Sequence, residues 1–347
     1  MDIPVALKPF ETVPSIDGLQ RPLRELRMSV IDRCNFRCTY CMPADSLQGR
    51  GVFLPLEKLL TDHEIVDVVG AFTRLGVRKL RITGGEPLIR PGLPALIEQL
   101  SDIAELDDIA LTTNGVMLPR LAEDLAAAGL SRITVSLDTL DQEVLDRLSG
   151  GKAKLGQILD GISAAEAAGF EQIKINSVVQ QGINDHTILD LLEHFRGTPH
   201  RVRLIEFMDV GNSNHWRSDD VVSNAAWVEQ INLRWPIEPV GEHNPSETAK
   251  RYSYCDGQGE IGFISSITQP FCGGCTRARV TADGILYTCL FGNRGTNLLP
   301  LVRHNRNRED LARKIHEVWA ARKDRYSEER GQPGHDQQKV EMYRMGG

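Results

Sequence analysis

The sequence has no long apolar run, no excess of positive charge and no cysteines scattered in the manner of a disulfide framework. Nowhere do eighteen apolar residues follow one another, and the first thirty residues hold no apolar stretch of the length that a signal peptide needs. A net charge of -7 argues against a nonspecific nucleic-acid surface. The seven cysteines are grouped, which is typical of metal binding in a reducing compartment. We therefore expect a cytoplasmic protein that binds neither membranes nor nucleic acid.

Three cysteines in the spacing C-x3-C-x2-C, Cys34, Cys38 and Cys41, constrain the chemistry most. Iron–sulfur clusters are usually held by four cysteine thiolates, so three thiolates leave one iron free to bind a group that is not protein. Structural zinc requires four tetrahedral ligands, and nothing near this segment supplies a fourth. Core packing of three thiols is disfavoured, because the neighbours Asp32 and Arg37 are polar. The spacing therefore predicts a cluster with an open iron.

A second group of three, Cys272, Cys275 and Cys289, has the spacing C-x2-C-x13-C. The alternating residues between the second and third cysteines predict a strand, a turn at Asp283-Gly284 and a returning strand. This hairpin would bring the third thiol back beside the first two. Three ligands again imply a cluster with an open iron.

Zinc is a stronger rival at this second group, because a fourth ligand could come from His243, His304 or Cys255. Arg277 and Arg279 favour a different interpretation, since they lie two apart on the predicted strand and share one face. A guanidinium matches phosphate oxygens with two parallel hydrogen bonds. The pair therefore indicates a site for an anionic ligand beside the metal.

Apolar, β-rich runs alternate with helical patterns over the first two thirds of the chain. This order predicts a parallel sheet with helical crossovers, and six repeats suggest a partial barrel. The predicted strands are 26–31, 79–83, 109–113, 132–138, 172–176 and 201–207, and the predicted helices are 56–75, 93–103, 118–128, 158–168 and 187–196.

The predicted strands alternate apolar with polar residues, whereas a parallel sheet buried on both faces would be almost continuously apolar. One face therefore packs on helices and the other lines a cavity. Five cations occupy the second face: Arg27, Lys79, Arg81, Lys174 and Arg203. Each alone is more simply a solvated residue at a strand edge, but five together in a net acidic chain predict a cavity for a polyanion such as a triphosphate.

The first cysteine group, with Tyr40 one before its last thiol, resembles the signature of the radical S-adenosylmethionine (SAM) superfamily. Further segments resemble one family within it, the GTP 3',8-cyclases of molybdenum cofactor biosynthesis (protein A). The resemblance covers about residues 25 to 347, and it departs in Thr276, where relatives carry Asn, and in the extra Cys255. The segments that carry it are 26–34, 81–87, 207–211, 272–289 and the final Gly346-Gly347.

The resemblance implies a role for each matching residue, with catalytic roles for Arg277, Arg279, Gly346 and Gly347. Two [4Fe-4S] clusters would be held by Cys34, Cys38 and Cys41 and by Cys272, Cys275 and Cys289. SAM would contact Tyr40, Gly85, Ser136 and Met208, and GTP would contact Arg27, Lys79, Arg81, Thr112, Lys174, Arg203, Arg277 and Arg279. The two glycines of Gly84-Gly85 would let the backbone approach a ligand closely.

The implied reaction converts GTP to (8S)-3',8-cyclo-7,8-dihydroguanosine 5'-triphosphate, the first step of molybdopterin biosynthesis. A 5'-deoxyadenosyl radical removes the ribose H3', and the carbon radical attacks C8 of guanine. The resemblance also implies a low-potential electron donor such as flavodoxin or ferredoxin, and a cyclic pyranopterin monophosphate synthase that receives the product. It leaves a homodimer open.

The implied fold is a partial (β/α)6 TIM-type barrel of radical SAM type with a smaller C-terminal α+β iron–sulfur domain. Its divisions are an N-terminal extension 1–24, the barrel 25–235, and a second-cluster and GTP-binding domain 236–347 that ends in the Gly-Gly tail. The charged run 322–330 reads as a solvated linker. Two rival functions are a peptide-modifying radical SAM enzyme with an auxiliary cluster and a non-catalytic iron–sulfur electron carrier.

Overall fold

The computed structural model describes residues 14–44, 53–241, 246–305, 308–331 and 339–346. Its strands are β1 (Glu25–Ser29), β2 (Lys79–Thr83), β3 (Asp108–Thr113), β4 (Arg132–Ser136), β5 (Lys174–Val179), β6 (Arg201–Glu206), β7 (Ile237–Pro239), β8 (Lys250–Tyr254), β9 (Glu260–Ile264), β10 (Arg277–Val280), β11 (Ile285–Tyr287) and β12 (Thr296–Asn297). The six strands that the sequence predicts correspond to β1 to β6, with ends shifted by up to three residues.

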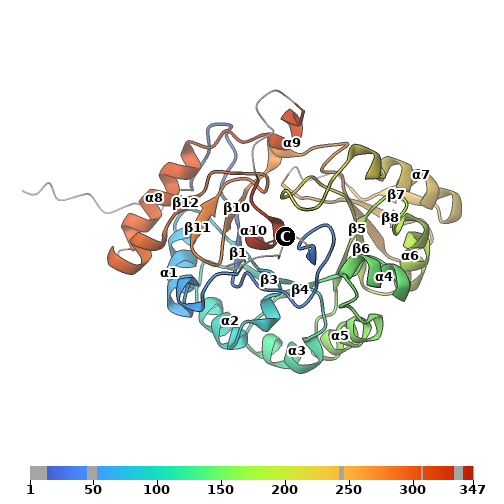
Figure 1. The fold of residues 1–347 in the computed structure, drawn as a ribbon, viewed down its shortest axis with the longest axis horizontal. Helices are drawn as coiled ribbons and strands as arrows, with labels where there is room; N and C mark the ends of the chain where they lie inside the picture. The colour runs from blue at the N-terminus through green and yellow to red at the C-terminus, as the bar shows by residue number, and fades with distance from the viewer. Residues whose placement is uncertain (1–13, 45–52, 242–245, 306–307, 332–338, 347) are drawn as a thin grey trace, which may run out of the picture.

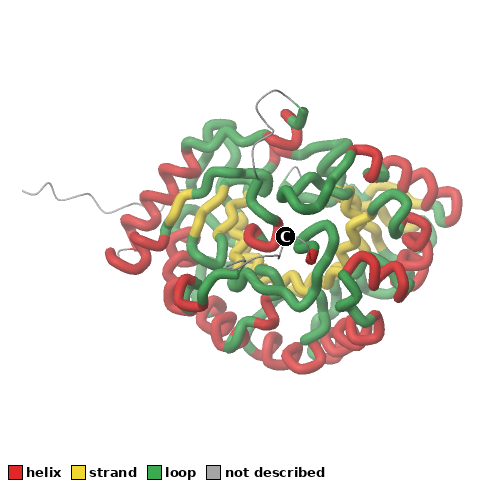
Figure 2. The backbone as a smooth tube through the Cα atoms, in the orientation of Figure 1, coloured by secondary structure: helices red, strands yellow, loops and turns green. Residues whose placement is uncertain are grey.

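All of these strands form one sheet in the order β12-β11-β10-β1-β2-β3-β4-β5-β6-β9-β8-β7. Neighbours from β1 to β6 are parallel, as the alternation of strands and helices predicts. The sheet curls into a ring with helices on its outside (Figures 1 and 2). Among the described residues its edge strands are β12 and β7, so the barrel is partial.

The helices that the sequence predicts cover the outside of the ring, whereas the short C-terminal helix α10 (Met342–Met345) lies near its centre (Figure 1). The other α-helices of the described residues are α1 (Asp62–Thr73), α2 (Leu93–Ser101), α3 (Leu118–Ala127), α4 (Gln142–Ser149), α5 (Leu155–Ala167), α6 (Ile188–Phe195), α7 (Asn224–Arg234), α8 (Arg308–Ala320) and α9 (Tyr326–Glu329). The sequence analysis predicts neither α4 nor α7. It also begins α1 too early, because the Thr61 side chain and Glu64 form a capping box that starts the helix at Asp62.

The core lies between the outer face of the sheet and the helices. In β1, Leu26 and Met28 are fully buried, and in α1, Ile65, Val68 and Phe72 belong to the same apolar cluster. Because successive side chains of a strand point to opposite faces, packing of the apolar set against helices turns the polar set toward the interior of the ring.

The strands that follow residue 236 add to the barrel sheet at both of its edges. β10 pairs with β1 and β9 pairs with β6, both in parallel, and β11 and β8 extend these edges in antiparallel fashion. The C-terminal cysteines are thereby placed beside the first strand of the chain. The division at residue 235 stays a prediction. None of the helices in the described parts of the chain combines the length and apolar character that a bilayer crossing demands.

Candidate active site

A cavity of about 890 Å³ runs through the ring of strands. Ligand sites usually measure roughly 300–1,000 Å³, so it has room for a nucleotide. The predicted site residues that line it are Cys34, Cys38, Tyr40, Cys41, Gly85, Ser136 and Met208, then Arg27, Lys79, Arg81, Thr112, Lys174 and Arg203, and finally Cys272, Cys275, Arg277, Arg279 and Cys289. The fold thus gathers both cysteine groups and the predicted cations around one space.

The first cysteine group lies on the loop that follows β1, and this loop is anchored on the end of α4. The backbone N–H of Arg37 donates to the Ser149 carbonyl (3.1 Å), and that of Thr39 donates to the Leu148 carbonyl (2.9 Å). The Met42 N–H donates to the Cys38 carbonyl (2.9 Å). The loop is therefore held by backbone hydrogen bonds, which fix the direction of its thiols.

The glycines that follow β2 allow this loop to pack closely. The Gly85 N–H donates to the Ile31 carbonyl (2.7 Å), and the Glu86 N–H donates to the Arg33 carbonyl (2.8 Å). A side-chain carbon on Gly85 would lie well inside van der Waals contact of the Arg33 carbonyl oxygen, and one on Gly84 would crowd the Ile31 carbonyl. The close approach that these glycines allow is to the cysteine loop. Both glycines also line the cavity, so the contact of Gly85 with a ligand stays a prediction.

The Glu86 carboxylate joins three loops at this end of the cavity. It accepts from the backbone N–H groups of Leu88 (2.9 Å) and Asn114 (2.8 Å) and from the Thr113 hydroxyl (2.7 Å). Asn114 in turn donates to the Asn35 side chain (2.7 Å) beside the first cysteine. Burial raises the pKa of Glu86 to about 7, although these hydrogen bonds oppose the shift.

Asp138 is a second buried carboxylate here, and the sequence analysis gives it no role. It accepts from the Tyr40 hydroxyl (2.8 Å) and from the backbone N–H of Val178 (2.8 Å). Burial raises its pKa to about 6. Asp138 lies two residues after Ser136, so the two side chains share the cavity face. This pattern could have indicated Asp138 from the sequence. Through Tyr40 it positions the loop that carries the first cysteine group.

The chemistry of the first thiols fits an iron–sulfur cluster. Burial raises the pKa of all three thiols, to about 11 for Cys34, so they are protonated without metal and would release their protons when metal binds. Each thiolate of a cluster binds its own iron, so the ligands need not converge on one point. No three His, Cys, Asp or Glu side chains of the described residues surround a site for a single metal ion.

The second cysteine group lies on a turn and at the end of a hairpin. β10 and β11 pair in antiparallel fashion through a turn at Gly284, whose φ is +80°. The predicted hairpin is therefore confirmed, and it places Cys289 at the same cavity as Cys272 and Cys275. The Cys275 N–H donates to the Cys272 carbonyl (3.2 Å), which closes the turn between them.

Cations distinguish the second group from the first. Burial alone would raise the pKa of Cys275, but the guanidiniums of Arg277 and Arg322 lower it to about 6. Burial and the neighbouring Asp324 raise the pKa of Cys289 to about 12. One thiol of this group is thus prepared for metal before any metal binds.

The zinc alternative lacks a fourth ligand within the described part of the chain. Cys255 is exposed just after β8 and does not line the cavity. The other two candidates, His243 and the His304 side chain, lie outside the described residues. A second cluster with an open iron at this group therefore stays a prediction.

The predicted cations form a wall between the two cysteine groups. In the strand register Arg27 lies opposite Arg81 on one side and Arg279 on the other. Arg81 donates to the Thr112 hydroxyl (3.3 Å), so a further residue that is predicted to bind GTP contacts this wall. The Arg203 Nε donates to the Asn176 side chain (2.8 Å).

These cations repel one another. Burial, with the charges of Arg27 and Arg277, lowers the pKa of Arg279 well below its ordinary range. Burial, with Arg203 and further arginines nearby, lowers the pKa of Lys174 to about 7. Because an anion would relieve this repulsion, the wall favours a polyanionic ligand.

Glu25 is an acidic residue in the wall that the sequence analysis missed. It accepts from the Arg27 Nε (3.2 Å) and lies 3.8 Å from the Arg81 Nε. Burial would raise its pKa, but Arg27, Arg81 and Arg277 hold it at about 2. The period-2 pattern puts residues 25 and 27 on one face, so the signal was available. As an anion among guanidiniums, Glu25 holds the neighbouring arginines in place.

The C-terminal segment enters the ring, where Figure 1 shows α10 near the centre. Met345 is fully buried, and Arg279 donates to the Gly346 carbonyl (2.6 Å). A side-chain carbon on Gly346 would overlap the Thr83 side chain, and its φ is +70°. This position therefore suits glycine. Gly347 lies outside the described residues.

The comparisons with known proteins agree with this arrangement. Residues 28–195 match the radical SAM superfamily, and residues 200–328 match the family described as Molybdenum Cofactor Synthesis C. A GTP 3',8-cyclase of Xanthomonas campestris pv. campestris (strain B100) is 48% identical over 98% of this chain and 100% of its own. One of Acidothermus cellulolyticus is 49% identical over 91% of this chain and 89% of its own. The chain belongs to the GTP 3',8-cyclase family.

A solved structure shows the same fold at low sequence identity. Streptococcus suis SuiB bound to S-adenosylmethionine superposes with a TM-score of 0.60 at 14% identity, covering 86% of this chain and 66% of that one. Radical SAM proteins use SAM and a [4Fe-4S] cluster. In this member of the GTP 3',8-cyclase family, the three thiols of the first cysteine group are ligands that fit such a cluster. The individual SAM and GTP contacts stay predictions.

Proposed function

We propose that the chain is a radical SAM lyase that cyclises GTP to (8S)-3',8-cyclo-7,8-dihydroguanosine 5'-triphosphate. The observation that carries the proposal is the single cavity with three cysteines at each end and a wall of cations between them. A nucleoside triphosphate has the charge for the wall and the length to span it. The family to which the chain belongs supports this substrate.

The first end of the cavity serves the cofactor. Cys34, Cys38 and Cys41 would hold a [4Fe-4S] cluster, and Tyr40, Gly85, Ser136 and Met208 would contact SAM. This pair supplies the 5'-deoxyadenosyl radical that takes the hydrogen from C3' of the ribose, after which that carbon closes on C8 of guanine. The protein's part is to keep the loop fixed, through the Gly85 N–H, which donates to the Ile31 carbonyl, and through the Tyr40–Asp138 hydrogen bond.

The second end serves the substrate. Cys272, Cys275 and Cys289 would hold a second [4Fe-4S] cluster, and the open iron of that cluster would be the binding point for the guanine base. The phosphates would bind Arg27, Lys79, Arg81, Lys174 and Arg203, with Thr112 beside them. Fixing both ends of GTP makes the ring closure an oriented step within one molecule.

Arg277 and Arg279 have a further role in this proposal. Both are buried beside the second cysteine group, and Arg279 also holds the Gly346 carbonyl. From there they would stabilise charge on the base when an electron and a proton complete the reaction. The reductant is a low-potential carrier such as flavodoxin or ferredoxin, and the product passes to a cyclic pyranopterin monophosphate synthase.

The test is an anaerobic turnover of the reconstituted protein with dithionite, SAM and GTP. We expect 5'-deoxyadenosine and cyclised GTP together, measured by mass spectrometry. Deoxyadenosine without cyclised GTP would keep the radical SAM chemistry and remove GTP as substrate, leaving a peptide substrate as the alternative. Neither product, from protein with intact clusters, would favour an electron carrier.

A further inference from the structure

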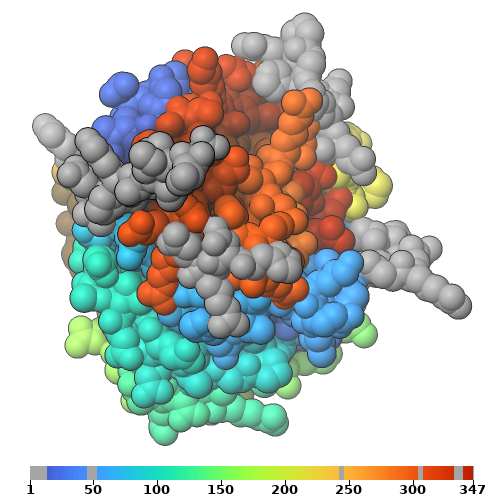
Figure 3. Space-filling model, turned by 90° about the vertical axis from the view of Figure 1, so that its left-hand side faces the viewer, coloured from blue at the N-terminus to red at the C-terminus, as the bar shows by residue number. Residues whose placement is uncertain are grey.

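Two segments from opposite ends of the chain meet behind the second cysteine group. The backbone N–H of Gly18 donates to the Arg322 carbonyl (3.2 Å), and the Ser15 hydroxyl lies 2.9 Å from the His316 ring. Figure 3 shows this contact on the surface, where blue N-terminal atoms lie against the red and orange C-terminal part. The expected solvated linker is therefore wrong at its start, because Arg322 is 4% exposed.

A buried carboxylate, Asp17, organises this region. Its Oδ1 accepts from the backbone N–H groups of Leu19 and Arg21 (both 2.9 Å). Its Oδ2 accepts from the Arg21 Nε (2.6 Å) and from the Arg322 Nη1 (3.3 Å). One carboxylate thus orients two guanidiniums that lie about 300 positions apart in the sequence.

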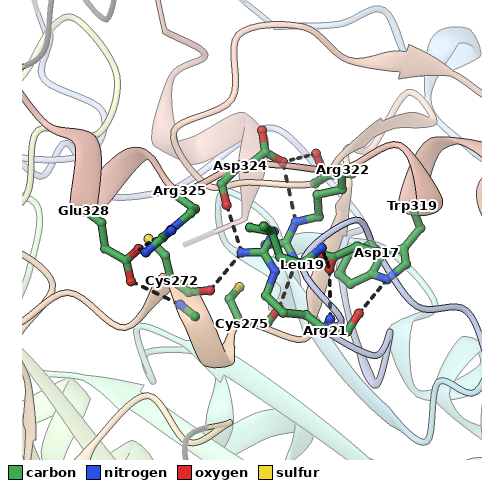
Figure 4. Close-up of polar contacts among 12 residues, drawn as sticks. Asp17, Leu19, Arg21, Cys272, Cys275, Trp319, Arg322, Asp324, Arg325 and Glu328 are labelled. Atoms are coloured by element: carbon green, nitrogen blue, oxygen red, sulfur yellow. Dashed lines mark hydrogen bonds and ion pairs between the residues drawn. The ribbon is translucent and has the colours of Figure 1, made fainter.

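Each guanidinium reaches the backbone of a cysteine (Figure 4). Arg21 Nη1 donates to the carbonyls of Cys272 (2.8 Å) and Asp324 (2.8 Å). Arg322 Nη1 donates to the Cys275 carbonyl (2.8 Å). The two ends of the C-x2-C turn are therefore held from behind by two charged donors, which fix the turn more firmly than neutral ones would.

Packing makes this support rigid. The Arg322 guanidinium lies 4.5 Å from the centroid of the Trp319 ring, and the indole N–H donates to the Arg21 carbonyl (3.2 Å). Trp319 is 1% exposed. Because every member is buried and contacts another, the side chains have little freedom to move the cysteines.

One donor of this network is left over. Arg21 Nη2 is buried and has no hydrogen-bond acceptor among the described groups, whereas Arg322 Nε makes no hydrogen bond but forms an ion pair with the Asp324 Oδ2 (3.5 Å). Buried donors without acceptors are rare, so such groups in an otherwise satisfied network point to a missing partner. The sulfurs of an iron–sulfur cluster accept hydrogen bonds, and such bonds tune its reduction potential.

We propose that Asp17, Arg21 and Arg322 are positioning residues of the second cluster, which hold its cysteine turn and set both the retention and the reduction potential of the metal. The inference rests on the second cluster of the proposed function. It assigns a role to the N-terminal segment 14–24, which lies outside the barrel.

The experiment uses the full chain with Cys34, Cys38 and Cys41 replaced by Ala, so that only the second cluster can form. In this background we compare Arg21→Lys and Arg322→Lys with Arg308→Lys. Lysine keeps the charge but loses the fork that reaches two acceptors. Arg308 is the control for the loss of a guanidinium from the helix that carries Trp319. It pairs with Asp67 (2.7 Å), and its side chain is 46% exposed, whereas those of Arg21 and Arg322 are 3% and 2% exposed.

The measurements are iron and sulfide per chain, the rate of iron loss to a chelator, the midpoint potential and the melting temperature of the cluster-free chain. We expect iron loss about 10- to 100-fold faster in Arg21→Lys and Arg322→Lys, with a shifted potential, and neither change in Arg308→Lys. Unchanged iron loss and potential in both variants would overturn the inference, even if their melting temperatures fall.

Other outcomes remain decisive. If the protein that lacks the first three cysteines binds no iron, the second cluster of the proposed function is disproved. That outcome differs from a failure of Asp17, Arg21 and Arg322 to position the cluster. If the arginine variants aggregate, Asp17→Asn takes their place, because it keeps both arginines and removes only the charge that orients them. A rate of iron loss in Asp17→Asn equal to that of the Arg308→Lys control would then overturn the inference.

Discussion

Cys34, Cys38 and Cys41 share one continuous loop, whereas Cys272, Cys275 and Cys289 are divided between a turn and the end of a hairpin. The first loop is held by backbone hydrogen bonds and by close packing on Gly85. The second is held from behind by side chains from both ends of the chain. Similar sets of ligands are therefore supported in two different ways.

The pKa values of the buried carboxyl and thiol groups also differ between the two parts of the cavity. Burial raises the pKa of Glu86 at the first end to about 7, while cations hold the pKa of Glu25 in the wall at about 2. Cys275 has a lowered pKa, but all three thiols of the first loop have raised ones. In the proposed function the cationic sulfonium of SAM lies at the first end and the anionic nucleotide at the second.

Removal of one cysteine at each end should separate two activities, and this is the largest effect that we expect. Cys38→Ala should reduce both 5'-deoxyadenosine and cyclised GTP to background, because the first cluster is lost. Cys275→Ala should keep deoxyadenosine formation and lose only cyclised GTP. Mass spectrometry of anaerobic turnovers measures both products. Cys255→Ala is the control and should change neither, since this thiol is exposed and outside the cavity. Formation of cyclised GTP by Cys275→Ala would contradict the separate roles of the two cysteine groups.

The next effect tests the packing of the first loop. Gly85→Ala should lower the free energy of unfolding of the cluster-free chain by about 1–3 kcal/mol, because the new methyl group overlaps the Arg33 carbonyl. Gly273→Ala, within the second cysteine turn, should change it by less than about 0.5 kcal/mol, because its methyl group would meet no atom. Urea unfolding followed by circular dichroism gives both values. Equal losses would show that the two loops are packed alike.

The first cysteine group could be predicted from the sequence because its three cysteines and their neighbours lie in one short segment. The cations of the wall were accessible for a related reason, since alternation along each strand places Arg27, Arg81 and Lys174 on the inner face. Both depend only on local patterns that survive folding unchanged. The packing of Gly85 on the Arg33 carbonyl was not predicted, because the sequence does not show which segment approaches this glycine.

The supports of the second group depend on contacts that leave no local pattern. Arg21 and the Asp324 carbonyl are 303 positions apart, and nothing near either residue indicates the other. The pairing of β10 with β1 is of the same kind, because a parallel neighbour can come from any part of the chain. From its sequence alone, a charged stretch such as 322–330 is expected to be solvated, because the residues that bury its first arginine lie far away in the sequence.

A third effect concerns the C-terminal segment that reaches the wall. Gly346→Ala should reduce cyclised GTP about 100-fold while deoxyadenosine formation changes little, because the methyl group overlaps Thr83 and moves the segment off Arg279. Gly331→Ala is a matched control, since its φ of +84° carries the same backbone strain but its methyl group would meet no atom. Both rates come from the turnover assay. Equal rates in both variants would mean that the overlap at Thr83 is harmless.

The smallest effect tests whether the cations of the wall act on the substrate through their charge. Lys174 has a pKa of about 7, lowered first by burial and then by neighbouring arginines. A triphosphate favours its ammonium form, so binding should take up a proton, and affinity should weaken as the pH rises above about 7.

The loss of affinity should reach at most about 10-fold per pH unit. Calorimetric titration with GTP in buffers of different ionisation enthalpy measures the affinity and the proton uptake together. Lys174→Arg keeps its charge in this range and should bind without the uptake. Because GTP itself titrates near neutral pH, the difference between the two proteins is the quantity that counts. Identical pH profiles would show that Lys174 does not meet the phosphates, and the cationic wall would then act through its arginines alone.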